Sequence, residues 1–171
     1  ILNMLCYNCF MKICVFPGSF DPISNGHLDL INRMSKIFDK VYVLVSYNAK
    51  KNYLFTVEER KNLISRCIKH LDNVEIAASE GMVVDFARSV NATVIVRGLR
   101  NANDYQNELE ISYFNHSLDE NIETMLMFAS KDNLFVSSSL IKELIHYGGD
   151  AKKYLPIEIV DDVTSRVNKI H

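Results

Sequence analysis

The chain has 171 residues, of which 48% are hydrophobic and 23% charged, and its formal net charge is −2. This composition is typical of one compact globular domain with a sizeable core, and it argues against disorder. The small negative charge gives no general attraction to nucleic acid or to an anionic membrane, so we expect a small ligand and a local cluster of Lys and Arg for any anion. Without a membrane-spanning apolar run or a recognisable secretory signal, a cytoplasmic enzyme is expected.

The start of the chain is set apart from the rest. Residues 1–10 precede Met11 and a predicted strand, and we interpret them as an N-terminal extension or an expression remnant beside a single domain of residues 11–171. The cysteines are Cys6, Cys9, Cys14 and Cys67. The first two have C-x-x-C spacing, but neither a second ligand pair for zinc nor a thioredoxin-like context is visible. A structural or incidental role is therefore expected for these thiols.

From Met11 onward, short β-branched runs alternate with helical patterns. The candidate strands are Lys12–Phe16, Val41–Ser46, Val74–Ala77, Thr93–Val96 and Thr124–Phe128. Strands that alternate with helices indicate βαβ units, in which all strands run parallel. The sequence therefore predicts an α/β fold with an open parallel sheet of about five strands and helices on both faces.

The segments between the strands carry apolar residues at helical spacing. The stripes are Leu30, Ile31, Met34, Ile37 and Phe38; Leu63, Ile64, Cys67, Ile68 and Leu71; Val83, Phe86, Ala87 and Val90; and, more roughly, Leu109, Ile111, Phe114 and Leu118. Thr56 and Glu59 have capping-box spacing, so a helix should begin there. Pro156 suits the first turn of a terminal helix that runs to about Lys169.

The first predicted strand leads into a turn-rich segment that ends in Asn25-Gly26-His27 at the head of a helix. Free N–H groups and the helix dipole favour an anion at such a place, so a phosphate handled beside His27 is the first hypothesis. The segment contains neither the dinucleotide-binding fingerprint nor a P-loop. An N-terminal surface histidine is the local alternative.

Three further residues of this segment could have either a functional or a structural role. Gly18 would let the backbone approach a phosphate closely and Ser19 would add a hydroxyl, although a turn glycine and a capping serine are the simpler readings. Asp21 could bind magnesium, yet an Asp before a proline in a turn more often stabilises the backbone. We therefore expect Asp21 to be structural.

Polar and cationic residues also follow the other predicted strands. They are Asn48, Lys50 and Lys51 after the second, Arg97, Gly98 and Arg100 after the fourth, and Ser130 and Lys131 after the fifth. Ligands of open α/β sheets bind outside the carboxyl ends of the strands. The pattern favours a polyanionic small molecule held by cationic side chains, with ordinary solvated surface charges as the alternative.

Ser137, Ser138 and Ser139 precede another amphipathic pattern, formed by Leu140, Ile141, Leu144 and Ile145. The first turn of that helix would offer N–H groups and hydroxyls to a second anion, and Lys142 could reach the same phosphate. An ordinary serine N-cap is a serious rival for this reading.

Four motifs together resemble those of the bacterial phosphopantetheine adenylyltransferases, in the nucleotidyltransferase superfamily. They are Pro17–Pro22, Ser24–His27, Arg97–Arg100 and Val136–Ser139, and the likeness runs from Met11 to about Leu155. The resemblance implies a Rossmann-like fold, usually as a homohexamer. It implies transfer of the adenylyl group of ATP to 4′-phosphopantetheine with Mg²⁺, which gives dephospho-coenzyme A and pyrophosphate in the penultimate step of coenzyme A synthesis.

The same resemblance implies roles for individual positions. His27 matches the residue that stabilises the transition state. The positions that match ATP-binding residues are Ser19, Phe20, His27, Gly98, Leu99, Arg100, Glu108, Asn133, Leu134, Phe135, Val136, Ser137, Ser138 and Ser139. Those that match acceptor-binding residues are Ser19, Lys51, Val83 and Arg97. No protein ligand for the metal is implied.

The chain departs from the family pattern at a few positions. Ser19 and Ser24 stand where threonine is common, which keeps the hydroxyl. Asn52-Tyr53 replaces a familiar Lys-Pro, so the sequence leaves open whether Lys50 or Lys51 points inward. Asn107 stands where an aromatic residue often precedes the glutamate, which weakens any prediction of stacking there.

The chemistry fits the residues. An acceptor phosphate with a second pKa of about 6 is largely dianionic at neutral pH and needs no general base. Alignment and charge neutralisation remain, which suit His27, Ser19, Lys51, Arg97 and Arg100. The alternative interpretations are a nicotinamide-mononucleotide adenylyltransferase, a glycerol-phosphate cytidylyltransferase and a catalytically silent nucleotide-binding module. A class I aminoacyl-tRNA synthetase is not expected, because it needs anticodon and editing regions for which 171 residues leave no room.

Overall fold

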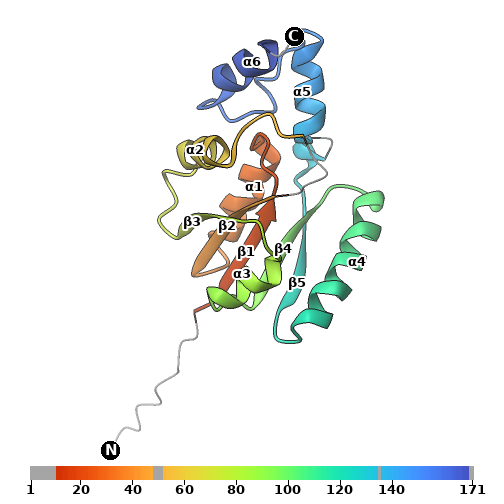
Figure 1. The fold of residues 1–171 in the computed structure, drawn as a ribbon. Helices are drawn as coiled ribbons and strands as arrows, with labels where there is room; N and C mark the ends of the chain where they lie inside the picture. The colour runs from red at the N-terminus through yellow and green to blue at the C-terminus, as the bar shows by residue number, and fades with distance from the viewer. Residues whose placement is uncertain (1–10, 48–51, 135, 170–171) are drawn as a thin grey trace, which may run out of the picture.

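A computed structural model describes residues 11–47, 52–134 and 136–169 (Figure 1). Several predictions fall outside these ranges. They concern residues 1–10 with Cys6 and Cys9, the loop residues Asn48, Lys50 and Lys51, and Phe135.

The centre of the fold is a five-stranded parallel sheet. Its strands are β1 (Ile13–Gly18), β2 (Lys40–Ser46), β3 (Val74–Ser79), β4 (Val94–Leu99) and β5 (Glu123–Phe128), in the order β3-β2-β1-β4-β5. The order places the switch in winding direction at β1, whose neighbours are β2 and β4. This confirms the predicted α/β fold with a Rossmann-like sheet, although β4 continues through Arg97 and Gly98, which were expected to follow it.

Helices cover both faces of the sheet (Figure 1). They are α1 (Asn25–Met34), α2 (Val57–Cys67), α3 (Val83–Ser89), α4 (Ala102–Leu118), α5 (Ser138–His146) and α6 (Val160–Asn168), with a short 3₁₀ turn, η1, at Lys131–Asn133. The capping box at Thr56 and Glu59 is confirmed: the Thr56 hydroxyl accepts from the Glu59 N–H, and the Glu59 carboxylate accepts from the Thr56 N–H.

The predicted start of the terminal helix is wrong. Pro156 lies before α6, in a turn in which the Ile159 N–H donates to the Pro156 carbonyl at 3.1 Å. The helix begins only at Val160, where Asp161 and Asp162 supply the negative charge that suits a first turn. The turn at Pro156 ends before the hydrogen bonds of α6 begin, so Pro156 belongs to this turn and not to the helix.

Side chains that alternate along the strands divide the core in two. Phe16, Val43 and Val96 face the layer formed by α1, α2, α5 and α6, whereas Val15 and Leu44 face α3. Cys14 and Cys67 are buried in the first layer, where burial raises the pKa of both thiols to about 12. Neutral thiols packed as small hydrophobes agree with the structural role expected for these two residues.

The long helix α4 packs along β5 on the face shared with α3. Its predicted stripe is largely uncovered: Ile111, Phe114 and Leu118 are exposed, and Asn115 is its one buried residue in the part of the chain described. The apolar spacing predicted the helix, but these side chains do not belong to the core. In the described residues, no helix combines the length and the apolar character needed to cross a membrane.

Candidate active site

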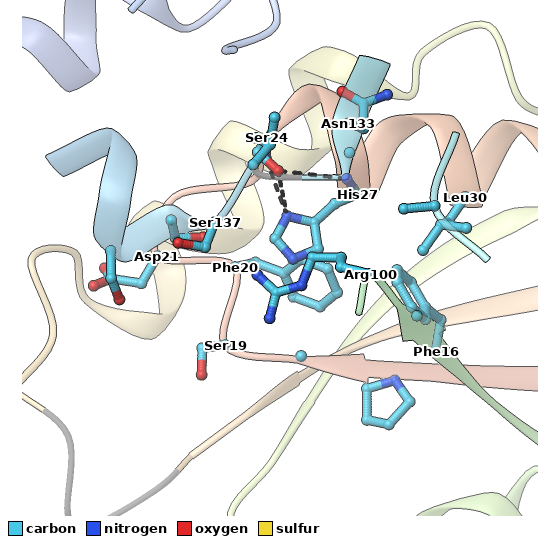
Figure 2. A pocket seen from close by; sticks show the side chains of 18 of the residues that line it. Phe16, Ser19, Phe20, Asp21, Ser24, His27, Leu30, Arg100, Asn133 and Ser137 are labelled. Carbon is cyan, nitrogen blue, oxygen red and sulfur yellow. Dashed lines mark hydrogen bonds between the residues drawn. The ribbon is translucent and has the colours of Figure 1, made fainter. Parts of the chain in front are cut away.

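A cavity of about 470 Å³ lies at the carboxyl ends of β1, β4 and β5 (Figure 2). Parallel strands bring segments that are distant in sequence to this one edge, as expected. The lining residues are Phe16–Asp21, Ser24, Gly26, His27, Leu30, Asn52, Tyr53, Arg97, Gly98, Arg100, Glu108, Ala129, Asn133, Val136–Ser139 and Lys142.

His27 occupies the first turn of α1 and is held by the cap of that helix. The backbone N–H of Ser24 donates to His27 Nδ1 at 3.2 Å, and the Ser24 hydroxyl lies 2.9 Å from the same atom. Because an amide N–H can only donate, Nδ1 must carry the lone pair, and the proton of the neutral ring is on Nε2. Figure 2 shows the ring below Ser24, beside the guanidinium of Arg100.

The imidazole is kept uncharged by its surroundings. Burial, and secondarily the positive charge of Arg100, lowers the pKa of His27 to about 4. The rings of Phe20 and Phe16 lie with centroids 5.1 and 6.5 Å from the imidazole centroid. His27 therefore presents a neutral N–H donor to a partly apolar wall, which suits stabilisation of a developing negative charge better than proton abstraction.

The turn after β1 is shaped by an aromatic ring. Phe20 has a φ of 47°, uncommon for a residue with a side chain, and its ring folds back over Gly18. A Cβ added at Gly18 would lie 2.9 Å from Phe20 Cζ. Gly18 is thus required by the packing of Phe20, a different reason from the phosphate approach that the sequence suggested.

Asp21 has the structural role expected of it. Its buried carboxylate accepts from the N–H groups of Leu54 and Phe55, at 3.0 and 2.9 Å, and from Lys142 Nζ at 2.7 Å. It ties the loop before α2 and the helix α5 to the turn after β1. Lys142, which was expected to reach a phosphate, lines the cavity and forms an ion pair with Asp21.

The two arginines at the end of β4 both line the cavity, each oriented by one carboxylate. Arg97 binds Glu108 through Nε and Nη2, at 2.6 and 2.9 Å, and donates through Nη1 to the Pro17 carbonyl at 3.3 Å. Arg100 binds Asp104 through Nε at 2.9 Å and Nη2 at 3.1 Å. A bidentate partner fixes the plane of a guanidinium and leaves further N–H groups for a ligand.

The far wall is the start of α5. The Ser137 hydroxyl caps the helix by accepting from the Leu140 N–H at 3.1 Å, and the Ser138 hydroxyl donates to the Pro22 carbonyl at 2.8 Å. The N-cap alternative is therefore correct for Ser137, and it coexists with a place in the cavity wall. Gly98 also lines the cavity, and a Cβ added there would stand 2.7 Å from Leu30 Cδ1.

Several predicted residues do not line the cavity. Val83 packs at the start of α3 against the second core layer, and the side chain of Leu99 is buried. Leu134 and the strand-end residues Ser130 and Lys131 also lie outside the lining set. Lys51 and Phe135 are not among the described residues.

Sequence reasoning missed Arg60. Its side chain is only 1% exposed, and Nη1 donates to the Ser19 carbonyl at 2.7 Å. A signal was available: Arg60 stands three and four residues before Leu63 and Ile64, so it falls on the apolar face of α2. A charge on a buried face indicates a specific partner.

Comparison with known proteins agrees with this geometry. Residues 15–144 match the cytidylyltransferase-like family. A phosphopantetheine adenylyltransferase of Clostridium beijerinckii is 44% identical over 158 residues, covering 92% of this chain and 99% of that protein. The chain belongs to the phosphopantetheine adenylyltransferase family. A relative of the same name from Lachnoclostridium phytofermentans is 43% identical over 92% of this chain and 97% of its own length.

Membership of this family makes the chain a nucleotidyltransferase. Solved structures agree on the fold: a nicotinate-nucleotide adenylyltransferase of Vibrio parahaemolyticus, described as putative, has a TM-score of 0.67 at 20% identity, covering 91% of this chain and 96% of that one. A nicotinic acid mononucleotide adenylyltransferase of Plasmodium falciparum has a TM-score of 0.65 at 16% identity, covering 94% and 96%. At these identities the likeness concerns the sheet and its helices alone.

Proposed function

We propose that the cavity binds ATP and 4′-phosphopantetheine together and that its described residues carry out the reaction of the family. The chain transfers the adenylyl group of ATP to the acceptor phosphate, releasing pyrophosphate and forming dephospho-coenzyme A. The observation that supports this mechanism best is the fixed tautomer of His27, whose Nε2–H donor faces a cavity bordered by Arg97, Arg100 and the start of α5.

The two substrates are proposed to meet at Ser19 and His27. ATP lies along Phe20, Gly98 and Arg100 toward Asn133 and the first turn of α5, where helix N–H groups favour its phosphates. The acceptor phosphate lies on the other side, toward Arg97, with Lys51 as a further proposed contact. Glu108, which matches an ATP-binding position of the family, lines the cavity and orients Arg97 through a bidentate pair, and its contact with ATP stays a prediction.

In the proposed step, an oxygen of the acceptor phosphate attacks the α-phosphorus of ATP. A new P–O bond forms as the bond from the α-phosphorus to the bridging oxygen breaks, and the electron pair leaves with pyrophosphate. The acceptor is already dianionic, so no residue needs to remove a proton. His27 Nε2–H donates to the α-phosphate oxygen on which charge builds, and the arginines neutralise the flanking phosphates.

Magnesium is proposed to arrive with the nucleotide. In the described residues, no group of three or more His, Cys, Asp or Glu side chains is arranged to hold a metal ion. The cavity carboxylates of Asp21 and Glu108 are engaged by Lys142 and Arg97. Phosphate oxygens of ATP and water are ordinary ligands for Mg²⁺, which when bound would offset phosphate charge.

We further propose that the protein acts in the cytoplasm as a homo-oligomer, a hexamer in the family pattern. Exposed apolar side chains on α4 and the edge strand β5 support assembly; they are Tyr105, Ile111, Tyr113, Phe114, Leu118, Met125 and Phe128, the last exposed by 70%. Large apolar side chains exposed in this number on a helix and the neighbouring edge strand are typical of a subunit interface.

A pyrophosphate-release assay tests the proposed substrate. ATP is offered with 4′-phosphopantetheine, nicotinamide mononucleotide or glycerol phosphate in parallel, and the products are identified by mass spectrometry. We expect turnover with 4′-phosphopantetheine and dephospho-coenzyme A as the product. Preferential turnover of either other acceptor would overturn the assignment, and no turnover with any acceptor would favour a silent nucleotide-binding module.

A further inference from the structure

Arg60 is a buried cation without a carboxylate partner among the described residues. It belongs to the start of α2 and is only 1% exposed, and no ion pair in the described part of the chain includes it. Its Nη1 donates to the Ser19 carbonyl at 2.7 Å and its Nε to the Thr56 carbonyl at 3.4 Å. Burying a charged group is costly unless its N–H groups find acceptors. The Ser19 and Thr56 carbonyls are these acceptors, so the guanidinium holds the turn after β1 against the start of α2.

The face of the same guanidinium lies over an aromatic ring of the cavity wall. Arg60 Cζ is 4.1 Å from the centroid of the Tyr53 ring, close enough for a cation–π contact. Tyr53 also lies against Tyr47 at the end of β2, with ring centroids 5.8 Å apart. The position of this wall is thus set by stacking.

The loop that carries Tyr53 is tied to the turn after β1 at two places. Asp21 accepts from the N–H groups of Leu54 and Phe55, and Arg60 joins the Tyr53 ring to the Ser19 carbonyl. Ser19 and Tyr53 both line the cavity. Arg60, which does not itself line the cavity, therefore connects two residues that do.

We infer that Arg60 is a positioning residue that fixes the Ser19 turn and aligns Tyr53 as an aromatic wall of the acceptor half of the cavity. The inference rests on the proposed function, which assigns one half of the cavity to the acceptor and the other half to ATP. Tyr53 comes from the β2 side of β1, whereas Arg100 and Asn133 come from the β4 and β5 side. The hydrogen bond to Ser19 affects turnover, because Ser19 borders the reacting phosphates. The stack on Tyr53 affects acceptor binding.

These two effects separate positioning from general stability. Steady-state kinetics with both substrates varied are measured for Tyr53→Leu, Tyr53→Phe, Arg60→Met and the control Arg66→Met. Arg66 belongs to the same helix but pairs with Asp162 of α6, away from the cavity. Circular dichroism and thermal unfolding establish the folded fraction of each variant.

Tyr53→Leu should raise the KM for 4′-phosphopantetheine about 10-fold, with the KM for ATP within about twofold, as expected for loss of one desolvated aromatic contact. Tyr53→Phe keeps the ring and should recover most of that loss. Arg60→Met should raise the acceptor KM similarly and also lower kcat about 10-fold, because the Ser19 carbonyl loses a charged donor. A double variant that combines Tyr53→Leu with Arg60→Met is measured as well, and its acceptor KM should be no higher than that of either single variant, since the same stack is lost in all three. Arg66→Met should leave both kinetic constants near their wild-type values.

The inference is overturned if Tyr53→Leu leaves the acceptor KM unchanged, if it raises both KM values equally, or if the two substitutions are additive. If Arg60→Met does not fold, the comparison of Tyr53→Leu with Tyr53→Phe decides, because these two variants differ in whether the aromatic ring is kept. Failure of the proposed function is visible separately in the wild-type protein. Should that protein turn over a different acceptor, the same variants are measured with that acceptor, and its KM is again compared with the KM for ATP and with kcat.

Discussion

Replacement of His27 by alanine is the sharpest perturbation of the proposed chemistry. Nε2–H is a neutral donor whose tautomer is fixed by the Ser24 N–H, and no proton transfer is assigned to it. Loss of one preorganised donor to a developing oxyanion typically lowers turnover by about 10² to 10³, or about 2.7–4 kcal/mol. We expect that decrease in kcat for His27→Ala, with the KM for each substrate changed much less, because the contact strengthens in the transition state.

The same substitution also has a structural effect that must be separated. Ser24 is 1% exposed, and its N–H loses its acceptor when the imidazole is removed. A lost cap or an unpaired buried donor costs about 1–2 kcal/mol of stability. His27→Gln provides the control, since a glutamine at this capping-box position can again accept from Ser24.

The assay is single-turnover formation of dephospho-coenzyme A at saturating substrates, combined with thermal unfolding of each variant. His27→Gln should recover stability but only part of the rate. A His27→Ala protein that is folded and turns over within about threefold of wild type would refute the transition-state role, because the expected effect is at least about 10².

Four other predictions follow from the same geometry. Burial holds the pKa of His27 at about 4, whereas in the unfolded chain the imidazole takes up a proton below about pH 6.5. Acid therefore favours the unfolded state, and the free energy of unfolding should have its maximal value above about pH 6.5 and be about 2 kcal/mol lower at about pH 5. Over the neutral range kcat should show no imidazole titration, and a His27-dependent ionisation near pH 7 would contradict the neutral donor. Asp21→Ala should cost about 3 kcal/mol, because it leaves a lysine and two amides without their buried acceptor; calorimetry should show a Tm lower by about 6–12 °C. Gly98→Ala should lower the free energy of unfolding by about 1–3 kcal/mol through the clash with Leu30, and thermal unfolding unchanged from the wild type would contradict close packing of Gly98 against Leu30. Phe128→Glu should dissociate the proposed oligomer in light scattering, whereas an unchanged mass would exclude this face as the interface.

Much of the fold follows from local patterns. β-Branched runs such as Val41–Ser46 are typical of a sheet covered on both faces, and the structure places all five predicted strands in such a sheet. The cap at Thr56 was predictable because a hydroxyl and a carboxylate three residues apart satisfy two free N–H groups. The helix α4 was predictable from its spacing, but the exposure of Phe114 was not, because spacing alone does not say what covers a stripe.

The candidate site was predictable where function depends on strand ends. His27, Arg97 and Arg100 do converge on one cavity. The partners that orient them were harder to foresee: the pairing of Glu108 with Arg97 joins a helix to a strand through side-chain geometry that no sequence spacing encodes. The contact of Arg60 with the Ser19 carbonyl joins α2 to β1 in the same way. Sequence motifs indicate which groups meet the ligand, whereas tertiary packing decides what holds those groups in place.

The stereochemical course at the α-phosphorus tests the account most directly. With ATP carrying a chiral α-phosphorothioate, direct attack by the acceptor phosphate in line with the leaving pyrophosphate must invert the configuration at phosphorus. The account predicts inversion in the phosphorothioate analogue of dephospho-coenzyme A. Retention would require two displacements and a covalent adenylyl-enzyme, and it would contradict a cavity that works by aligning two substrates.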